Sequence, residues 1–218
     1  MSLHYIIHLA NYSDGILYIL AVLLLIALTV MIDRFWALRL TLIQGKKIVY
    51  KTGSFEVLTT HDLKQLRMNA GSLPEAQLFE VALRYPDIER TELGNRLDES
   101  IMLLAPKLDR RLWVLDTVVT LAPLMGLFGT IIGMFHAFSV LAAPGHAPIE
   151  VTGGVADALA ATAFGIFIAM LGLTGYNALT NQVRHIIHQL ESLRTMLMNR
   201  TEAETVTQPI HVSSLLRA

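Results

Sequence analysis

The sequence predicts an all-α membrane protein with three transmembrane helices, and composition and charge distribution both support this. The chain has 218 residues, of which 53% are hydrophobic, and a mean hydropathy of +0.50. That is too apolar for an ordinary soluble domain. Thirteen of the seventeen Lys and Arg residues lie within residues 34–111, and the other four follow Gln182. The longest apolar runs therefore lie in stretches that contain no basic residue.

The basic residues also predict an orientation. Cytoplasmic loops of membrane proteins carry an excess of Lys and Arg, whereas the loops on the other side do not. Residues 34–111 and the part of the chain after Gln182 are therefore expected in the cytoplasm, and the N-terminus outside. No basic residue precedes the first apolar run and no small-residue cleavage site follows it, so we expect this run to be a retained span.

The first half of the chain divides into three predicted segments. Residues 1–12 place apolar side chains at helical spacing, which is typical of an amphipathic helix at the outer interface. Residues 13–36 form the first transmembrane helix, since Ile16 to Ile32 is free of charge. Residues 37–111 are polar and helix-favouring and predict a cytoplasmic helical region.

Two predicted helices lie within that cytoplasmic region. Ser72-Leu73-Pro74-Glu75 fits a capping box that would begin one helix, and Tyr85-Pro86 would end it. Residues 88–111 read as a second, amphipathic helix that leads into the next span.

The second half of the chain contains the other two predicted spans. Residues 112–143 form the second transmembrane helix, residues 144–154 a short periplasmic loop, and residues 155–180 the third. Residues 181–218 form a cytoplasmic helix and tail. The helix carries a heptad seam suited to packing on other copies of the chain, made of Val183, Ile186, Leu190, Leu193 and Leu197.

The second and third spans each carry a stripe of small residues interrupted by one threonine. The stripes are Gly126, Thr130, Gly133 and Ala137 in the second span, and Ala158, Thr162, Gly165, Ala169 and Gly172 in the third. Such stripes commonly serve close helix packing. Alternatively, one stripe lines an interior channel in which the threonine hydroxyl contacts water or a passing ion.

Several polar residues lie in or near the spans. Asp157, at the outer end of the third span, fits either an ion pathway or a helix N-cap. His136 near the outer end of the second span is more typical of a hydrogen-bonded structural residue. Asp116 and Asp33 lie at the cytoplasmic boundaries, where salt bridges with Arg110, Arg111 and Arg34 are expected. Alternatively, Asp116 faces a pore exit.

Other classes of function find little support in the sequence. The chain has no cysteine, which excludes disulfides and thiolate sites. Hydrolase, metalloprotease and P-loop signatures are absent, and the eight histidines lack metal-ligand spacing, so we expect no enzyme activity, metal or cofactor. Acidic residues balance the basic region, which argues against nucleic-acid binding.

Two motifs carry a resemblance to a known family. Residues 122–134, APLMGLFGTIIGM, resemble the APLLGLLGTV-x-GM signature of the MotA/TolQ/ExbB proton channel family. Residues 155–165, VADALAATAFG, followed by Tyr176 and Asn177, resemble that family's IAEALLATAxG…YN segment, except that Asp157 replaces a glutamate. Three spans and the C-terminal residues favour the ExbB-type branch, whereas residues 134–138 are closer to TolQ.

The resemblance implies a function and an assembly. Such proteins form homopentamers around two copies of a single-span ExbD/TolR-type partner in the bacterial inner membrane. Thr130 and Thr162 match the family's pore threonines, and Asp157 its third-span carboxylate. The implied role is a proton-channel or motor subunit that harvests the proton motive force and passes work to a TonB-type protein for outer-membrane transport. The alternatives are a TolQ-type subunit of the Tol-Pal system and a non-conducting scaffold for partner helices.

Overall fold

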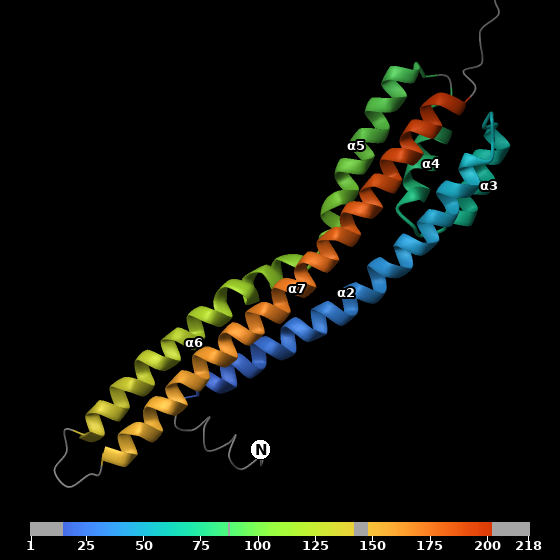
Figure 1. The fold of residues 1–218 in the computed structure, drawn as a ribbon. Coiled ribbons are helices and arrows are strands. Elements are labelled where there is room, and N and C mark those ends of the chain that lie inside the picture. Colours follow the sequence, from blue (N-terminus) through green and yellow to red (C-terminus); the bar gives the residue numbers. More distant parts are fainter. Residues whose placement is uncertain (1–14, 87, 142–147, 202–218) are drawn as a thin grey trace, which may run out of the picture. The chain divides into compact units, whose positions relative to one another are not determined.

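The regular structure of the described chain is helical. The computed structural model describes residues 15–86, 88–141 and 148–201, and the predicted interfacial helix of residues 1–12 lies outside these ranges, as does most of the tail. The helices in these ranges, shown in Figure 1, are α2 (Ile16–Gly53), α3 (Thr60–Ala70), α4 (Glu75–Arg84), α5 (Arg90–Leu108), α6 (Leu112–Leu141) and α7 (Pro148–Arg200).

The chain divides into two compact units. The first unit comprises Met1–Leu40 and Lys107–Arg184, and the second comprises Thr41–Pro106 and His185–Ala218. Helices α2 and α7, of 38 and 53 residues, therefore contribute residues to both units.

Three helices are long and apolar enough to cross a membrane, judged by length and composition. They lie over Ile16–Gly53, Leu112–Ser139 and Thr152–Arg200. Large apolar side chains remain exposed on them, for example Leu25 at 64% and Phe135 at 69%. A membrane helix satisfies its own backbone polar groups and leaves such side chains to lipid. The prediction of an all-α fold with three candidate membrane helices is confirmed.

The helix bounds differ from the expected segments in three places. Helix α2 continues to Gly53, well beyond residue 36. Helix α7 begins at Pro148, inside the segment expected as a loop, because proline is well tolerated in the first helical turn. Helix α5 ends at Leu108, and Arg111 has a positive φ of 71°, so a turn separates α5 from α6.

The heptad seam of α7 is covered within the chain itself. Ile186, Leu190, Leu193 and Leu197 are each 0% exposed. The expectation that the seam packs on other copies is therefore wrong. Apolar residues at this spacing need a helical surface to cover them, and the sequence pattern does not reveal which chain supplies that surface.

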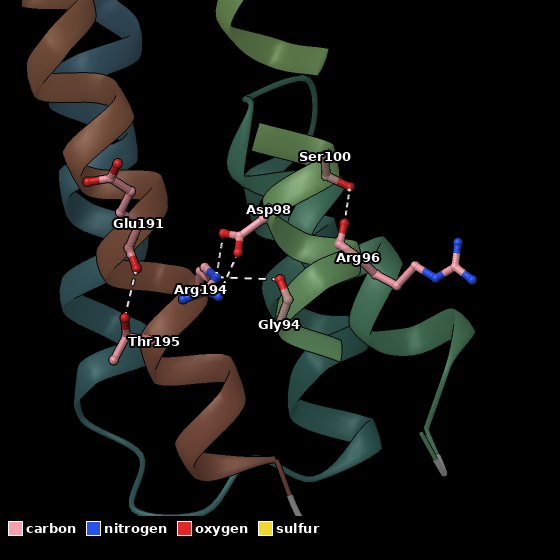
Figure 2. A network of polar contacts seen from close by, with 7 residues as sticks. All are labelled: Gly94, Arg96, Asp98, Ser100, Glu191, Arg194 and Thr195. Atoms are coloured by element: carbon pink, nitrogen blue, oxygen red, sulfur yellow. Dashed lines mark hydrogen bonds and ion pairs between the residues drawn. The ribbon is translucent and has the colours of Figure 1, made fainter. Parts of the chain in front are cut away.

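Polar contacts join the helices of the second unit. Arg194 on α7 donates to Asp98 on α5 at 2.6 Å and to the carbonyl oxygen of Gly94 at 3.4 Å (Figure 2). Arg200 donates to the carbonyl oxygens of Gly53 and Phe55 at 2.8 and 2.7 Å. The last carbonyls of a helix lack partners within it, so this guanidinium satisfies the end of α2.

The capping box occurs on a different helix from the one expected. Helix α4 begins at Glu75 after Pro74 and has no side-chain cap. Glu75 is fully buried, so its carboxyl is directed into the unit instead of back to Ser72. The observed box is on α3, where Thr59 and Asp62 cap each other's backbone N–H groups at 3.1 and 3.3 Å. The Thr59 hydroxyl also donates to the Asp62 carboxylate at 2.6 Å, and this bond, together with the one from the Thr59 backbone N–H, holds the pKa of Asp62 below its usual range.

Candidate functional site

The small residues of α6 and α7 bring the two backbones into direct contact. A Cβ built on Gly126 would lie 2.9 Å from the carbonyl oxygen of Ala161, and one built on Gly165 would lie 2.5 Å from that of Ala122. Real side chains essentially never approach this closely. Gly133 likewise contacts Ala158, whose exposure is 1%. The two predicted stripes therefore face each other within one chain.

Two threonines form the polar centre of this contact. The Thr162 hydroxyl donates to the carbonyl oxygen of Gly126 at 2.9 Å and lies 3.5 Å from the Thr130 hydroxyl. Thr130, which is 8% exposed, donates to the carbonyl oxygen of Leu127 at 2.6 Å. A hydroxyl has one hydrogen and two lone pairs, so both oxygens keep acceptor capacity after donating.

The surroundings of this pair are apolar or small. Ala137 and Ala161 are buried at 3% and 0%, and Ala169 is partly exposed further along α7. The two hydroxyls are therefore polar groups within an otherwise small and apolar helix contact. The sequence alone placed both threonines on small stripes, but it gave no signal that they would meet.

The two polar residues near the outer ends of the spans, Asp157 and His136, are both partly exposed. Asp157 is partly exposed and has no ion pair or hydrogen bond within the described residues. It precedes Ala158, which contacts Gly133, so it lies at the edge of the α6–α7 contact. The His136 ring is partly exposed, with its centroid 6.0 Å from that of Phe135.

One of the expected boundary salt bridges is present. Arg111 donates to Asp33 at 2.9 Å, and both side chains are 52% exposed. Arg34 is partly buried, whereas Asp116 is exposed and forms no ion pair within the described part of the chain. Asp33 and Arg111 thus connect α2 to the turn before α6, in which Arg111 has its positive φ.

Residues that the sequence did not single out also shape the site. Ala161 is 0% exposed and would lie 2.9 Å from a Cβ on Gly129, and Ile16 of α2 would lie 3.3 Å from the same atom. Gly175 on α7 similarly faces Met31 on α2. Gly129 lies within the motif at residues 122–134, and that position was the sequence signal that could have assigned it to the α6–α7 contact.

Comparison with known proteins points to one family. The pattern of the MotA/TolQ/ExbB proton channel family matches residues 70–192, which is more than half of the chain. The matched range contains both threonines and both small stripes.

Individual relatives carry two different names. The chain is 41% identical over 80 residues to the Tol-Pal system protein TolQ of Haemophilus influenzae, covering 36% of this chain and 35% of the relative. It is 32% identical over 114 residues to the putative biopolymer transport protein ExbB-like 3 of Synechocystis, covering 51% and 54%. It is 33% identical over 111 residues to the biopolymer transport protein ExbB of Aquifex aeolicus, covering 50% and 74%. The matches thus span about a third and about half of the first two relatives' lengths.

Proposed function

This chain belongs to the MotA/TolQ/ExbB proton channel family, and we propose that it is a proton-conducting subunit that harvests the proton motive force for work at the cell envelope. The observation that carries the proposal is the hydroxyl pair of Thr130 and Thr162 within an otherwise small and apolar contact of two membrane helices. Hydroxyl oxygens with free lone pairs can accept hydrogen bonds from water or from a protonated carrier group.

The proposed unit of function is a homopentamer around an ExbD/TolR-type single-span partner, with two partner copies in the pore. A lumen with few polar groups offers ions little compensation for lost hydration, so the ring alone would conduct poorly. A carboxyl on the partner helix supplies a protonatable group inside the lumen. In this arrangement Thr130 and Thr162 hydrogen-bond with the carrier or its water.

The proposed location is the bacterial inner membrane, with the N-terminus in the periplasm and the C-terminus in the cytoplasm. The supporting observation is the restriction of basic residues to 34–111 and to the chain after Gln182. The boundaries of the three spans at residues 13–36, 112–143 and 155–180 belong to the same proposal. Cysteine labelling from each side of the membrane, in a chain that has no native cysteine, tests it directly.

Within the family we propose an ExbB-type role, in which work passes to a TonB-type protein that opens outer-membrane transporters. The names of relatives support both branches, since ExbB proteins and TolQ both match. Expression in strains that lack either their ExbB-type or their TolQ-type subunit separates the two. Restored uptake through outer-membrane transporters supports the ExbB-type role, whereas restored envelope integrity alone supports the Tol-Pal role.

A specific observation also favours a scaffold function. Both threonine hydroxyls donate to carbonyl oxygens of the same chain, so the pair has a packing role without any ion. Under this alternative Gly126→Leu or Gly165→Leu breaks assembly, whereas replacing a hydroxyl by a methyl group of equal volume is harmless. The proton-conducting proposal expects the threonine replacement to stop conduction while the complex still assembles.

Proton flux into liposomes tests the proposal. The chain is reconstituted with its single-span partner, and an internal pH-sensitive dye reports the flux driven by a membrane potential. We expect Thr130→Val and Thr162→Val to lower the flux by about tenfold each, the change that corresponds to one lost hydrogen bond. The matched control is Thr174→Val on α7, the helix that also carries Thr162. The Thr174 hydroxyl donates to the carbonyl oxygen of Met170 in its own helix. Normal flux in both threonine variants would contradict the assignment of Thr130 and Thr162 to the proton pathway.

Asp157 belongs to the proposed pathway as its outer carboxylate. Its partial exposure at the edge of the α6–α7 contact leaves it accessible to an ion or a partner side chain. We expect Asp157→Glu, which restores the family's more usual residue, to retain flux and Asp157→Asn to lower it. Equal flux in all three proteins would exclude Asp157 from the pathway.

A further inference from the structure

Glu75 is a fully buried carboxyl in the second unit, remote in sequence from the proposed pore residues. It is the first residue of α4 and is 0% exposed. Neither of its carboxyl oxygens has a hydrogen-bond partner within the described residues. Acidic side chains are almost never fully buried unless they are paired, so this carboxyl requires an explanation.

The surroundings of Glu75 supply another acceptor instead of a donor. A Cβ built on Gly45 of α2 would overlap Glu75 Oε1 and would lie 3.0 Å from Oε1 of Gln189 on α7. Gln189 Oε1 is itself buried and lacks a hydrogen-bond donor within the described residues. Three acceptor oxygens therefore gather at Gly45, where the missing side chain leaves room for them.

The orientation of the Gln189 amide follows from its other contact. Gln189 Nε2 donates to the carbonyl oxygen of Leu42 at 3.3 Å. Turning the amide over would place its oxygen against that carbonyl, and two acceptors cannot bond each other. The amide oxygen therefore stays on the side of Gly45 and Glu75.

We propose that Glu75, Gln189 and Gly45 form a proton-binding site, in which Glu75 is a neutral carboxylic acid that donates its O–H to Gln189 Oε1. A bound proton converts one of the acceptors into a donor and so satisfies the Gln189 oxygen as well. The bond links α4 to α7, and Gly45 of α2 is small enough to permit it.

The electrostatics of the site agree with this assignment. Burial raises the pKa of the Glu75 carboxyl. No other charged group contributes to the shift. The charged side chains on the neighbouring parts of α2, α3, α4 and α7 are exposed to solvent: Lys46, Lys47, Arg67, Glu80, His185 and His188. On α5 and α7, Asp98 and Arg194 neutralise each other.

This site goes beyond the proposed channel function, because it lies outside the three predicted spans and needs neither threonine. Its occupancy depends on the pH around the second unit. Loss of the proton would leave the Glu75 carboxylate beside the Gln189 amide oxygen with no donor between them, which favours separation of α4 from Gly45 and Gln189. The structure of the second unit would therefore respond to a rise in pH.

Unfolding across a pH range tests the site. The folded chain binds the Glu75 proton more tightly than the unfolded chain, so its stability falls as pH rises from the ordinary pKa of 4.5 to the raised folded value. We expect the unfolding midpoint of the full chain in detergent to show this fall and Glu75→Gln to remove it. The amide of Glu75→Gln keeps a donor for Gln189 and cannot ionise. The matched control, Glu80→Gln on the same helix, changes an exposed carboxylate and should keep the wild-type pH dependence.

An infrared measurement on the unmodified chain covers the case in which Glu75→Gln does not fold. With isotope-labelled glutamate, a protonated carboxylic acid band that persists above the ordinary pKa of 4.5 supports the site, since the other glutamates within the described residues are exposed. Absence of that band overturns the proposal, as does an unchanged pH dependence in Glu75→Gln. Proton flux through the channel enters neither readout, so this proposal and the channel proposal fail independently.

Discussion

Thr162 donates its side-chain hydrogen to the carbonyl oxygen of Gly126, 2.9 Å away on the neighbouring membrane helix. The bond exists because neither Gly126 nor Gly165 has a side chain to separate the backbones of α6 and α7. The same residues therefore provide both the close helix packing and the hydrogen bond. Testing each contribution requires variants that change the packing or the hydrogen bond alone.

Adding a methyl group at Gly165 should disrupt the α6–α7 contact. The new Cβ would lie 2.5 Å from the carbonyl oxygen of Ala122, so a helix must move. We expect Gly165→Ala to lower the free energy of unfolding by about 1–3 kcal/mol. The control is Gly153→Ala on the same helix, where nothing lies within 4 Å of the new methyl. That variant should be neutral or more stable by up to about 1 kcal/mol, because alanine favours the helix. Equal effects at both positions would contradict the close contact.

The hydroxyl of Thr162 can be tested apart from its volume. Thr162→Ser keeps the donor to Gly126, whereas Thr162→Val keeps the shape and loses the hydrogen bond. We expect Thr162→Val to lower the unfolding free energy by about 0.5–1.5 kcal/mol and Thr162→Ser to keep normal proton flux. Unfolding in detergent and flux in liposomes measure the two effects. Normal flux in Thr162→Val together with lost flux in Thr162→Ser would mean that shape alone matters.

The membrane part of the fold could be predicted from the sequence because it depends on local composition. A charge-free run such as residues 16–32 has one stable solution in lipid, a helix. The end of α4 was also predictable, since Tyr85-Pro86 stops a helix and α4 ends at Arg84. Expectations that depended on distant partners did less well. Ser72 and Glu75 have the spacing of a capping box, but burial of Glu75 outweighs the local hydrogen bond.

The candidate site was predictable only in part, for a related reason. Spacing placed Thr130 and Thr162 on the small face of their own helices. Whether they meet depends on the register between α6 and α7, which the backbone contact of Gly126 with Gly165 sets. The sequence pattern contains no information about that register. For the same reason the seam of α7 predicted a helical partner without revealing that the chain covers it itself.

The left-handed backbone conformation at Arg111 predicts that glycine is a more stable replacement there than alanine. Its φ of 71° is costly for a residue with a Cβ and free for glycine. Its ion pair with Asp33 is half exposed, so it contributes no more than about 1 kcal/mol. Arg111→Gly loses the ion pair but relieves the strain, whereas Arg111→Ala loses the ion pair alone. We expect Arg111→Gly to be the more stable variant by about 1 kcal/mol in thermal unfolding. The reverse order would show that the turn does not require this conformation.

The ion pair of Arg194 and Asp98 should stabilise the second unit more through the forked donor geometry of the guanidinium than through its charge. Arg194 reaches both the Asp98 carboxylate at 2.6 Å and the Gly94 carbonyl oxygen at 3.4 Å, and its side chain is 28% exposed. Partial exposure limits the coupling to about 1 kcal/mol or less. A double-mutant cycle of Arg194→Ala and Asp98→Ala measures it by denaturant unfolding. Arg194→Lys keeps the charge but not the forked donors, so we expect it to recover less than half of the coupling. Full recovery would mean that charge alone holds α5 to α7.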